Sequence, residues 1–407
     1  MSRFLFVILL PLLFFSCSDV EKKTLSEGMW LTELEITDTE VLPFNFKLIK
    51  DNESHYKIEI YNADEVIQVD EIEVKNDSIF IKAPVFEGYL AGTFNKNVIT
   101  GSFIKESLDR VVPFKAYHNV SYRFKNKGSS NKDVNGIWKT EFLPNTPDSY
   151  LGKGIFEQKG DKVTGTFRTT TGDYRYLEGI VDGDSLKLSA FDGAHAFLFT
   201  AKVSDSTLNG IFYSGNHSRE SFVAKRDDTF ELPDANSLTF LKEGYDTLAF
   251  SFPNVEGDMV SLQDEAFKNK VVLVQIMGTW CPNCLDETKF YTKYLKSNQN
   301  DDLKVVALAF EYAKTKEAAF KSIERLQKRI GVPYPILLAQ YGTADKAKAQ
   351  EKLPMLNHIL SYPTTIFIDK NGEVRKIHTG FNGPATGEKH IAFKKEFSEF
   401  VTILLNE

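Results

Sequence analysis

The pattern of hydrophobic and polar positions divides the chain into two regions. Over residues 27–226, short stretches in which apolar and polar residues alternate are separated by Asn, Asp and Gly, for example at residues 56–61 and 165–168. Such alternation predicts antiparallel strands with one buried face, joined by tight turns. From residue 245 onward, unbroken apolar runs alternate with stretches of helical periodicity, which predicts an α/β domain.

The β region also contains an internal repeat. Three tripeptides recur at nearly equal offsets: Gly28-Met29-Trp30 as Gly136-Ile137-Trp138, Asp77-Ser78-Ile79 as Asp184-Ser185-Leu186, and Gly101-Ser102-Phe103 as Gly210-Ile211-Phe212. Equal offsets predict two copies of one unit of roughly 100 residues. We therefore expect β unit 1 at residues 27–127 and β unit 2 at residues 132–226, each closing into an antiparallel sandwich or small barrel with its Trp in the core.

The α/β region follows a charged segment at residues 227–244, which we interpret as a linker. The apolar run at residues 271–277 predicts a strand buried on both faces, as in the middle of a parallel sheet. The elements predicted after it are a helix to about residue 297, a strand at 303–310, a helix at 315–330, a strand at 335–339, further helix, hairpin strands at 364–369 and 374–378, and a helix at 390–405. We expect residues 245–407 to form one domain.

A pair of cysteines stands where the central strand of this domain meets its first helix, in Trp280-Cys281-Pro282-Asn283-Cys284. The free N–H groups and the dipole at a helix N-terminus favour thiolate over thiol, so Cys281 is placed to be a nucleophile. Pro282 suits the first helical turn because its missing N–H would have no partner there. Cys284, three residues on, lies on the same face and within disulfide reach.

Two structural interpretations compete with a redox role for this pair. A zinc site would need a second pair of ligands, but the chain has three cysteines in all, and no two of its seven histidines are three to five residues apart. A purely structural disulfide would close too short a loop to restrict the unfolded chain much. We therefore expect neither a metal nor a cofactor, and the spacing favours disulfide exchange.

The order of elements resembles the thioredoxin fold, and the motifs more narrowly resemble the TlpA-like branch of thioredoxins. The motifs that carry this resemblance are Phe252-Pro253-Asn254 with Gly257, Val260-Ser261-Leu262, Trp280 to Cys284 with Glu287, and Tyr362-Pro363-Thr364-Thr365-Ile366-Phe367-Ile368-Asp369 with Gly372. The resemblance covers about two fifths of the chain. It implies thiol-disulfide exchange in the cell envelope, with Cys281 attacking, Cys284 resolving, and Trp280, Pro282 and Asn283 supporting the site.

The resemblance also implies a cis Tyr362-Pro363 peptide beside the cysteine pair, where Tyr362 offers its backbone to a bound partner chain. Thioredoxins proper carry an Asp in the central strand, six residues before the first cysteine. Here that position is Gln275, which cannot titrate. The resemblance places Glu287 as a partly buried acid beside the site, and we expect it to take the proton of Cys284.

The N-terminus resembles a bacterial lipoprotein signal. Arg3 precedes a hydrophobic run at residues 4–15, which is shorter than the ~20 residues of a membrane-spanning helix, and Ser16 precedes Cys17. We expect a signal peptide at residues 1–16, lipidation of Cys17, a tether at residues 17–26, and a cell-envelope location on the periplasmic or outer-membrane side. Only Cys281 and Cys284 would then remain as thiols, so the redox partners must be other molecules.

Composition narrows the function further. The chain of 407 residues is 42% hydrophobic and 26% charged, with a net charge of −7 and no basic cluster, which argues against nucleic acid as a partner. We expect a membrane-anchored thiol-disulfide oxidoreductase that forms mixed disulfides with exported or membrane proteins, and reduction is the preferred direction. The alternative is a binding or scaffolding lipoprotein whose β half recognises a partner and whose thioredoxin-like half is only an interaction module.

Two other redox functions fit the motif less well. A peroxidase of the peroxiredoxin kind would need a Thr three residues before its reactive cysteine, and Gly278 stands at that position. A copper-delivery protein would need a wider cysteine spacing and a dedicated His, for which His358 and His378 are the candidates.

Overall fold

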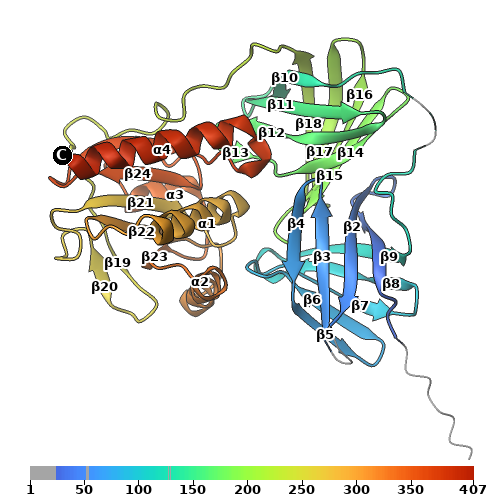
Figure 1. Cartoon of the computed structure of the whole chain (residues 1–407), viewed down its shortest axis with the longest axis horizontal. Helices are drawn as coiled ribbons and strands as arrows, with labels where there is room; N and C mark the ends of the chain where they lie inside the picture. The colour runs from blue at the N-terminus through green and yellow to red at the C-terminus, as the bar shows by residue number, and fades with distance from the viewer. Residues whose placement is uncertain (1–23, 52–54, 127, 129) are drawn as a thin grey trace, which may run out of the picture.

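The computed structural model describes residues 24–51, 55–126, 128 and 130–407. Two β units are stacked on one another, and an α/β domain lies beside them (Figure 1). Cys17, the expected signal peptide and most of the expected tether lie outside the described residues. Within the described ranges, no helix combines the length and the apolar character needed to cross a membrane.

β unit 1 is an antiparallel meander whose first and last strands pair with each other. Its strands are β1 (Gly28–Glu35), β2 (Val41–Lys50), β3 (Tyr56–Asn62), β4 (Glu65–Val69), β5 (Glu71–Lys75), β6 (Ser78–Lys82), β7 (Tyr89–Phe94), β8 (Val98–Lys105) and β9 (Arg110–His118). They lie in the order β4-β3-β2-β1-β9-β8-β7-β6-β5. The alternation of apolar and polar positions thus produces the antiparallel pairing that the sequence predicts.

β unit 2 has the same kind of meander and closes on itself through an added pairing of β11 with β12. Its strands are β10 (Gly136–Phe142), β11 (Tyr150–Lys159), β12 (Lys162–Thr169), β13 (Gly172–Asp173), β14 (Leu177–Asp182), β15 (Ser185–Phe191), β16 (Ala196–Val203), β17 (Thr207–Ser214) and β18 (Ser218–Arg226). Because β10 also pairs with β18, the sheet forms a barrel, from which the short β13 extends beside β12.

The two Trp residues fill the interiors of these units, as predicted. Trp30 and Trp138 are both fully buried. The indole N–H of Trp30 donates to the carbonyl of Ser26 at 3.0 Å, and that of Trp138 donates to the carbonyl of Val134 at 2.9 Å. Each bond satisfies the one polar atom of a large apolar side chain, which makes full burial favourable.

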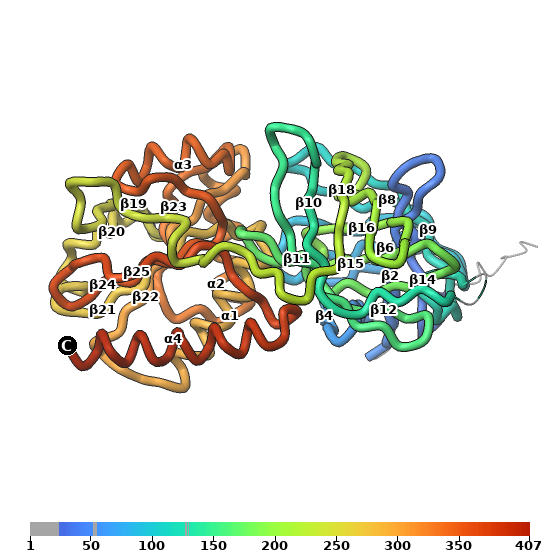
Figure 2. Tube along the Cα trace, turned by 90° about the horizontal axis from the view of Figure 1, so that it is seen from above, coloured from blue at the N-terminus to red at the C-terminus, as the bar shows by residue number. Residues whose placement is uncertain are grey.

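The α/β domain contains a five-stranded mixed sheet in the order β23-β22-β21-β24-β25. Its elements are β21 (Val271–Met277), α1 (Pro282–Ser297), β22 (Leu303–Phe310), α2 (Lys316–Ile330), β23 (Ile336–Gln340), α3 (Lys346–Lys352), β24 (Thr364–Ile368), β25 (Val374–Thr379) and α4 (Glu388–Asn406), preceded by the small hairpin of β19 (Ser251–Pro253) and β20 (Met259–Ser261). Every residue of β21 is buried, which confirms the predicted central strand. In Figure 2, α3 and α4 lie on opposite sides of this sheet.

Each of the three bodies has an apolar core of its own, and a few residues of a neighbouring body pack into two of these cores. Ala83, Phe86 and Ala194 of the β units belong to the apolar core of the α/β domain. Phe191 and Leu198 of β unit 2 belong to the core of β unit 1. The bodies therefore pack together as one assembly, and each keeps an apolar core of its own.

The segment interpreted as a linker, residues 227–244, lies along the α/β domain rather than spanning free space. Thr379 donates its N–H to the carbonyl of Ala235 at 3.0 Å. Phe240 donates its N–H to the side-chain oxygen of Asn357 at 2.9 Å, and Leu241 forms an isolated bridge with Leu356. This segment thus acts as a strap that fixes the α/β domain against β unit 2.

Candidate active site

The cysteine pair lies at the N-terminus of α1, directly after β21. Cys281 is the N-cap of α1 and is joined to Cys284 by a disulfide, with 5.2 Å between their Cα atoms. The N–H of Cys284 donates to Sγ of Cys281 at 3.2 Å, so the helix N-terminus is directed at that sulfur, as predicted. Cys281 is 6% exposed, whereas Cys284 is fully buried. Of the two sulfurs, Cys281 is therefore the one that an incoming group meets first.

The peptide between Tyr362 and Pro363 is cis, which confirms the expectation drawn from the family resemblance. The carbonyl oxygen of Tyr362 lies 3.4 Å from Sγ of Cys281. Trp280 packs edge-on against the Tyr362 ring, and its indole N–H donates to the carbonyl of Phe310 at 2.9 Å. These contacts fix both aromatic side chains beside the disulfide.

Glu287 is fully buried in a polar network on the inner side of α1. Its carboxylate accepts hydrogen bonds from Gln275 at 2.9 Å, Tyr291 at 3.0 Å and Thr365 at 2.9 Å. Burial raises the pKa of Glu287 to about 7, although these bonds lower it. The same Gln275 amide lies 3.5 Å from the carbonyl oxygen of Cys284. One side chain, that of Gln275, thus connects the Glu287 carboxyl, whose pKa is about 7, to the backbone of the cysteine pair.

A second buried carboxyl, Glu311, adjoins the site and was not singled out from the sequence. It follows β22 and accepts hydrogen bonds from the backbone N–H and the hydroxyl of Thr279, both at 2.7 Å. Burial raises the pKa of Glu311 to about 7, while the bonds from Thr279 lower it. One indirect indication of Glu311 was present in the sequence. This residue directly follows β22, and the carboxyl ends of the parallel strands β21 and β22 lie at the same edge of the sheet, next to the cysteine pair.

The turn that connects β12 to β13, together with the residues after β13, contacts the cysteine site from β unit 2. Asn283 donates its side-chain N–H to the carbonyl of Asp173 at 3.2 Å. The N–H of Gly383 donates to the Asp173 carboxylate at 2.8 Å, and the hydroxyl of Ser361 donates to the carbonyl of Thr171 at 2.8 Å. Asn283, which the sequence assigned only a supporting role inside the motif, therefore also ties the α/β domain to the β half.

Arg175 joins all three parts of the molecule. Its buried guanidinium forms ion pairs with Asp286 on α1, with Glu65 on β4 and, at 3.7 Å, with Asp192 after β15. Burial raises the pKa of Glu65 above its ordinary range, against the lowering effect of Arg175. One cation thus holds carboxylates from β unit 1, β unit 2 and the α/β domain together.

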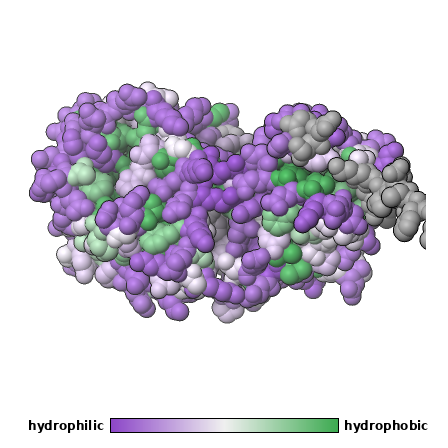
Figure 3. Space-filling model, turned by 90° about the horizontal axis from the view of Figure 1, so that it is seen from below, coloured by the Kyte–Doolittle hydropathy of each residue, from purple (hydrophilic) through white to green (hydrophobic). Residues whose placement is uncertain are grey.

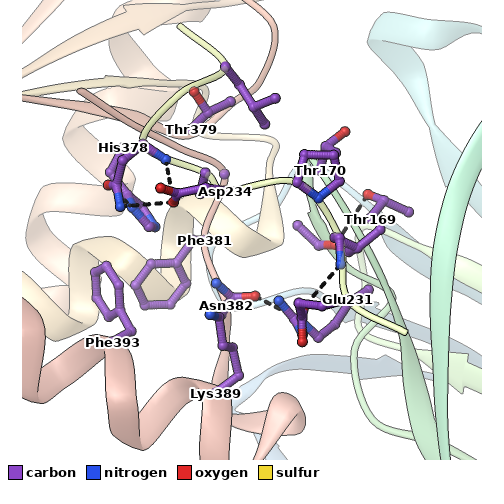
Figure 4. A pocket seen from close by; sticks show the side chains of 18 of the residues that line it. Thr169, Thr170, Glu231, Asp234, His378, Thr379, Phe381, Asn382, Lys389 and Phe393 are labelled. Carbon is purple, nitrogen blue, oxygen red and sulfur yellow. Dashed lines mark hydrogen bonds and ion pairs between the residues drawn. The ribbon is translucent and has the colours of Figure 1, made fainter. Parts of the chain in front are cut away.

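A cavity of about 230 Å³ lies behind this turn and is shown in Figure 4. It is lined by Thr169 and Thr170 on one side and by His378, Phe381 and the strap on the other. Burial lowers the pKa of His378 to about 4, so the imidazole is neutral near pH 7. Across the described ranges, no cluster of three or more His, Cys, Asp or Glu is arranged to hold a metal ion.

Comparison with known proteins relates the α/β domain to thioredoxin-like proteins. The Redoxin family model matches residues 242–392. The thioredoxin-like protein YneN of Bacillus subtilis is 32% identical over 141 residues, which are 34% of this chain and 73% of YneN. The thiol-disulfide oxidoreductase ResA of Geobacillus kaustophilus is 25% identical over 142 residues, covering 35% of this chain and 72% of ResA. A putative protein disulfide isomerase structure from Bacteroides thetaiotaomicron covers 43% of this chain at 20% identity, with a TM-score of 0.31.

The fold of residues 245–407 and its cysteine pair define a thioredoxin-like protein. The similarity to YneN over most of that protein's length shows that the chain belongs to the thioredoxin family, in its TlpA-like branch. Its enzyme class is thiol-disulfide oxidoreductase.

Proposed function

We propose that the chain is a lipid-anchored oxidoreductase of the cell envelope that exchanges disulfides of exported proteins through Cys281 and Cys284, with reduction as the preferred direction. One observation carries this proposal: a buried and a slightly exposed cysteine are linked at a helix N-terminus, beside a cis-proline peptide. This arrangement gives the two sulfurs different roles, because only one of them meets a partner directly. Names of thiol-disulfide oxidoreductases among the relatives support it.

The exchange proceeds in two displacements. In the reduced enzyme, the Cys281 thiolate attacks one sulfur of a partner disulfide, which breaks that bond, forms a mixed disulfide and releases the partner's other sulfur as a thiolate. The Cys284 thiolate then attacks Sγ of Cys281 and releases the second partner sulfur. The enzyme ends with its disulfide closed, and the partner has gained two electrons. The N–H of Cys284 supports the first step because it stabilises negative charge on Cys281.

Glu287 is proposed as the group that receives the proton of Cys284 before the second displacement. A base that titrates close to the working pH is the most effective acceptor, and burial raises the pKa of Glu287 to about 7. Glu287→Gln should leave the attack by Cys281 nearly intact but slow resolution, so that mixed disulfides accumulate. It should also alter the pH dependence of turnover near pH 7. The control is Glu311→Gln, which makes the same substitution at the other buried carboxyl and should leave this pH dependence unchanged.

The lipid anchor at Cys17 is a separate part of the proposal, since that residue lies outside the described ranges. Cys17→Ser should release the chain from membranes in fractionation and leave the redox activity of the purified protein unchanged. Continued membrane attachment of this variant would point to the β half as the anchor.

We also propose that the two β units are copies of one ancestral unit. Each is a meander with paired first and last strands, and each begins with a fully buried Trp bonded to the carbonyl four residues before it. Gly28 and Gly136, which precede these Trp residues by two positions, both have positive φ, at 116° and 98°. These shared features add to the three recurring tripeptides.

The central test is exchange by the purified chain from residue 18 onward, reduced beforehand and mixed with a small aromatic disulfide or with insulin. Thiol release should be fast in the wild type and absent in Cys281→Ser. Cys284→Ser should trap the mixed disulfide, and the same variant in cells should capture the natural partners. Equal rates for the wild type and Cys281→Ser would instead favour the scaffolding alternative. The contacts of β unit 2 with Asn283 and Ser361 are also compatible with that alternative.

A further inference from the structure

Residues 169–175, here called the active-site hairpin, contact three of the segments near the cysteine pair. Asp173 and Arg175 contact the first turns of α1 through Asn283 and Asp286. Thr171 contacts Ser361, which directly precedes the cis Tyr362-Pro363 pair. Asp173 also accepts the N–H of Gly383 in the loop after β25. In Figure 1, β13 accordingly lies beside the start of α4 and next to α1.

The hairpin and its seat approach each other at two glycines. Gly172 has a φ of +143°, and a Cβ at this position would overlap the Asn283 amide. A Cβ on Gly380 would lie 3.1 Å from the carbonyl oxygen of Thr170. A larger side chain at either position would strain the backbone and would require Asn283 or the Thr170 carbonyl to move, so glycine favours the close contact at both.

The seated hairpin leaves little room at the reactive sulfur. Cys281 is only 6% exposed, and Pro282 on the first turn of α1 is buried. A protein partner must bring its backbone alongside the sulfur that is attacked, whereas a small disulfide needs space for little more than its own two sulfurs. Ser361, which would flank such a partner chain, already donates its hydroxyl to Thr171.

The contacts that hold the hairpin are mostly polar, and a cavity lies beside it. The cavity of about 230 Å³ is lined by Thr169, Thr170 and Gly172 (Figure 4). A second cavity of about 700 Å³ lies along β12 and is lined by Thr164, Gly165 and Arg168. On the face shown in Figure 3, the surface where the lobes meet is mainly hydrophilic. Hydrogen bonds beside open space separate at lower cost than a packed apolar core, so the buried ion pair of Arg175 with Asp286 is the contact that most resists lifting of the hairpin.

We propose that the active-site hairpin determines which disulfides react at Cys281: when seated it admits small disulfides, and it must lift before a protein partner can form a mixed disulfide. This proposal rests on the proposed exchange at Cys281. It adds a specificity element from β unit 2 to a reaction whose cysteines lie in the α/β domain. The hairpin acts on access and takes no part in proton or electron transfer.

The test compares kcat/KM for insulin with kcat/KM for a small aromatic disulfide. Asp286→Asn removes the charge that holds Arg175 to α1 and leaves the two partners of Arg175 in the β half in place. The variant weakens the contacts that hold the hairpin on α1, so the hairpin is lifted in a larger fraction of molecules. The kcat/KM for insulin should therefore rise about tenfold. The value for the small disulfide should stay within about twofold.

Two further variants make the test independent of any one substitution. Ser361→Ala removes a single hydrogen bond to the hairpin and should raise the insulin value by roughly threefold. Asp302→Asn is the matched control, because it removes an ion pair with Lys270 at the opposite end of β21 and should change neither value.

Hydrogen exchange supplies a direct readout. In the free chain, Gly383 of the α/β domain donates its N–H to the Asp173 carboxylate of the hairpin. This amide should lose protection when Cys284→Ser is trapped as a mixed disulfide with insulin. Retained protection, or an equal effect of Asp286→Asn on both substrates, would overturn the proposal and make the hairpin a fixed wall. A wild type as inert as Cys281→Ser towards the small disulfide would overturn the proposed exchange itself.

Discussion

The two β units each place a short strand beside their third strand, but only one of these hairpins contacts the cysteine site. In β unit 1, β4 pairs with β3 over five positions, from Asn62↔Glu65 to Ile58↔Val69. In β unit 2, β13 pairs with β12 over two positions, Arg168↔Asp173 and Thr169↔Gly172. The shorter strand leaves the carbonyl groups of Thr171 and Asp173 to accept hydrogen bonds from Ser361 and Asn283 of the α/β domain. Shortening one strand of a meander is thus enough to turn a sheet edge into a contact surface.

The local sequences account for this difference. β4 reads Glu-Val-Ile-Gln-Val, in which β-branched residues favour an extended strand. The corresponding stretch of β unit 2 has Gly172 at a φ that β-branched residues do not adopt. The two hairpins meet at Arg175, which is paired both with Glu65 at the start of β4 and with Asp286 on α1.

The largest expected effect comes from removing the cation that joins the two hairpins. Arg175→Met would leave Glu65, Asp192 and Asp286 without their buried counter-charge. Breaking a buried pair from one side should lower the free energy of unfolding by about 3–5 kcal/mol, measured in urea. Lys162→Met is the control, because its pair with Glu178 is largely at the surface and should cost less than about 1 kcal/mol. Equal losses for the two variants would mean that Arg175 is not a structural centre.

A smaller effect is expected from a change confined to one hairpin. Gly172→Val adds a side chain that overlaps Asn283 and strains a positive φ, so it should lift the active-site hairpin. The insulin kcat/KM should rise roughly tenfold, with the small-disulfide value almost unchanged. Gln68→Val makes the matching change on the exposed face of β4 and should leave both rates as they are. A similar response to both variants would remove the distinction between the two hairpins.

The comparison also shows what the sequence could and could not predict. The cysteine pair and the central strand were predictable because a short motif and a run of apolar residues define them locally, whereas the cis peptide was expected only from the family resemblance. Glu287 was predictable from its spacing after Cys284. Its burial and its bonds to Thr365 are features that only the folded chain reveals.

The active-site hairpin could not be predicted in the same way. Arg175 is 111 residues from Asp286 and 110 residues from Glu65 along the chain. Neither periodicity nor a motif relates positions so far apart, and an isolated Arg in a β region is ordinarily at the surface. The contacts of residues 227–244 with Asn357 and Thr379 could not be predicted for the same reason, because the charged composition of this segment does not indicate them.

The smallest expected effect is a pH dependence that distinguishes Glu65 from other acids of β unit 1. Burial raises the pKa of Glu65 above its ordinary value of 4.5. The unfolded chain therefore releases this proton at a lower pH than the folded chain does. The stability contributed by the protonated form is fully present below pH 4.5 and is lost as the pH rises through the folded pKa.

Glu65→Gln holds the side chain permanently neutral and should remove this loss. Relative to the wild type, the variant should become progressively more stable as the pH rises above 4.5 and through the raised pKa of Glu65, as measured by urea unfolding at a series of pH values. Glu73→Gln, an exposed position on the neighbouring β5, is the matched control and should follow the wild type throughout. If the difference between Glu65→Gln and the wild type were constant with pH, or fell as the pH rose, then Arg175 would outweigh burial at Glu65. The two hairpins would then be held together mainly by ionised pairs.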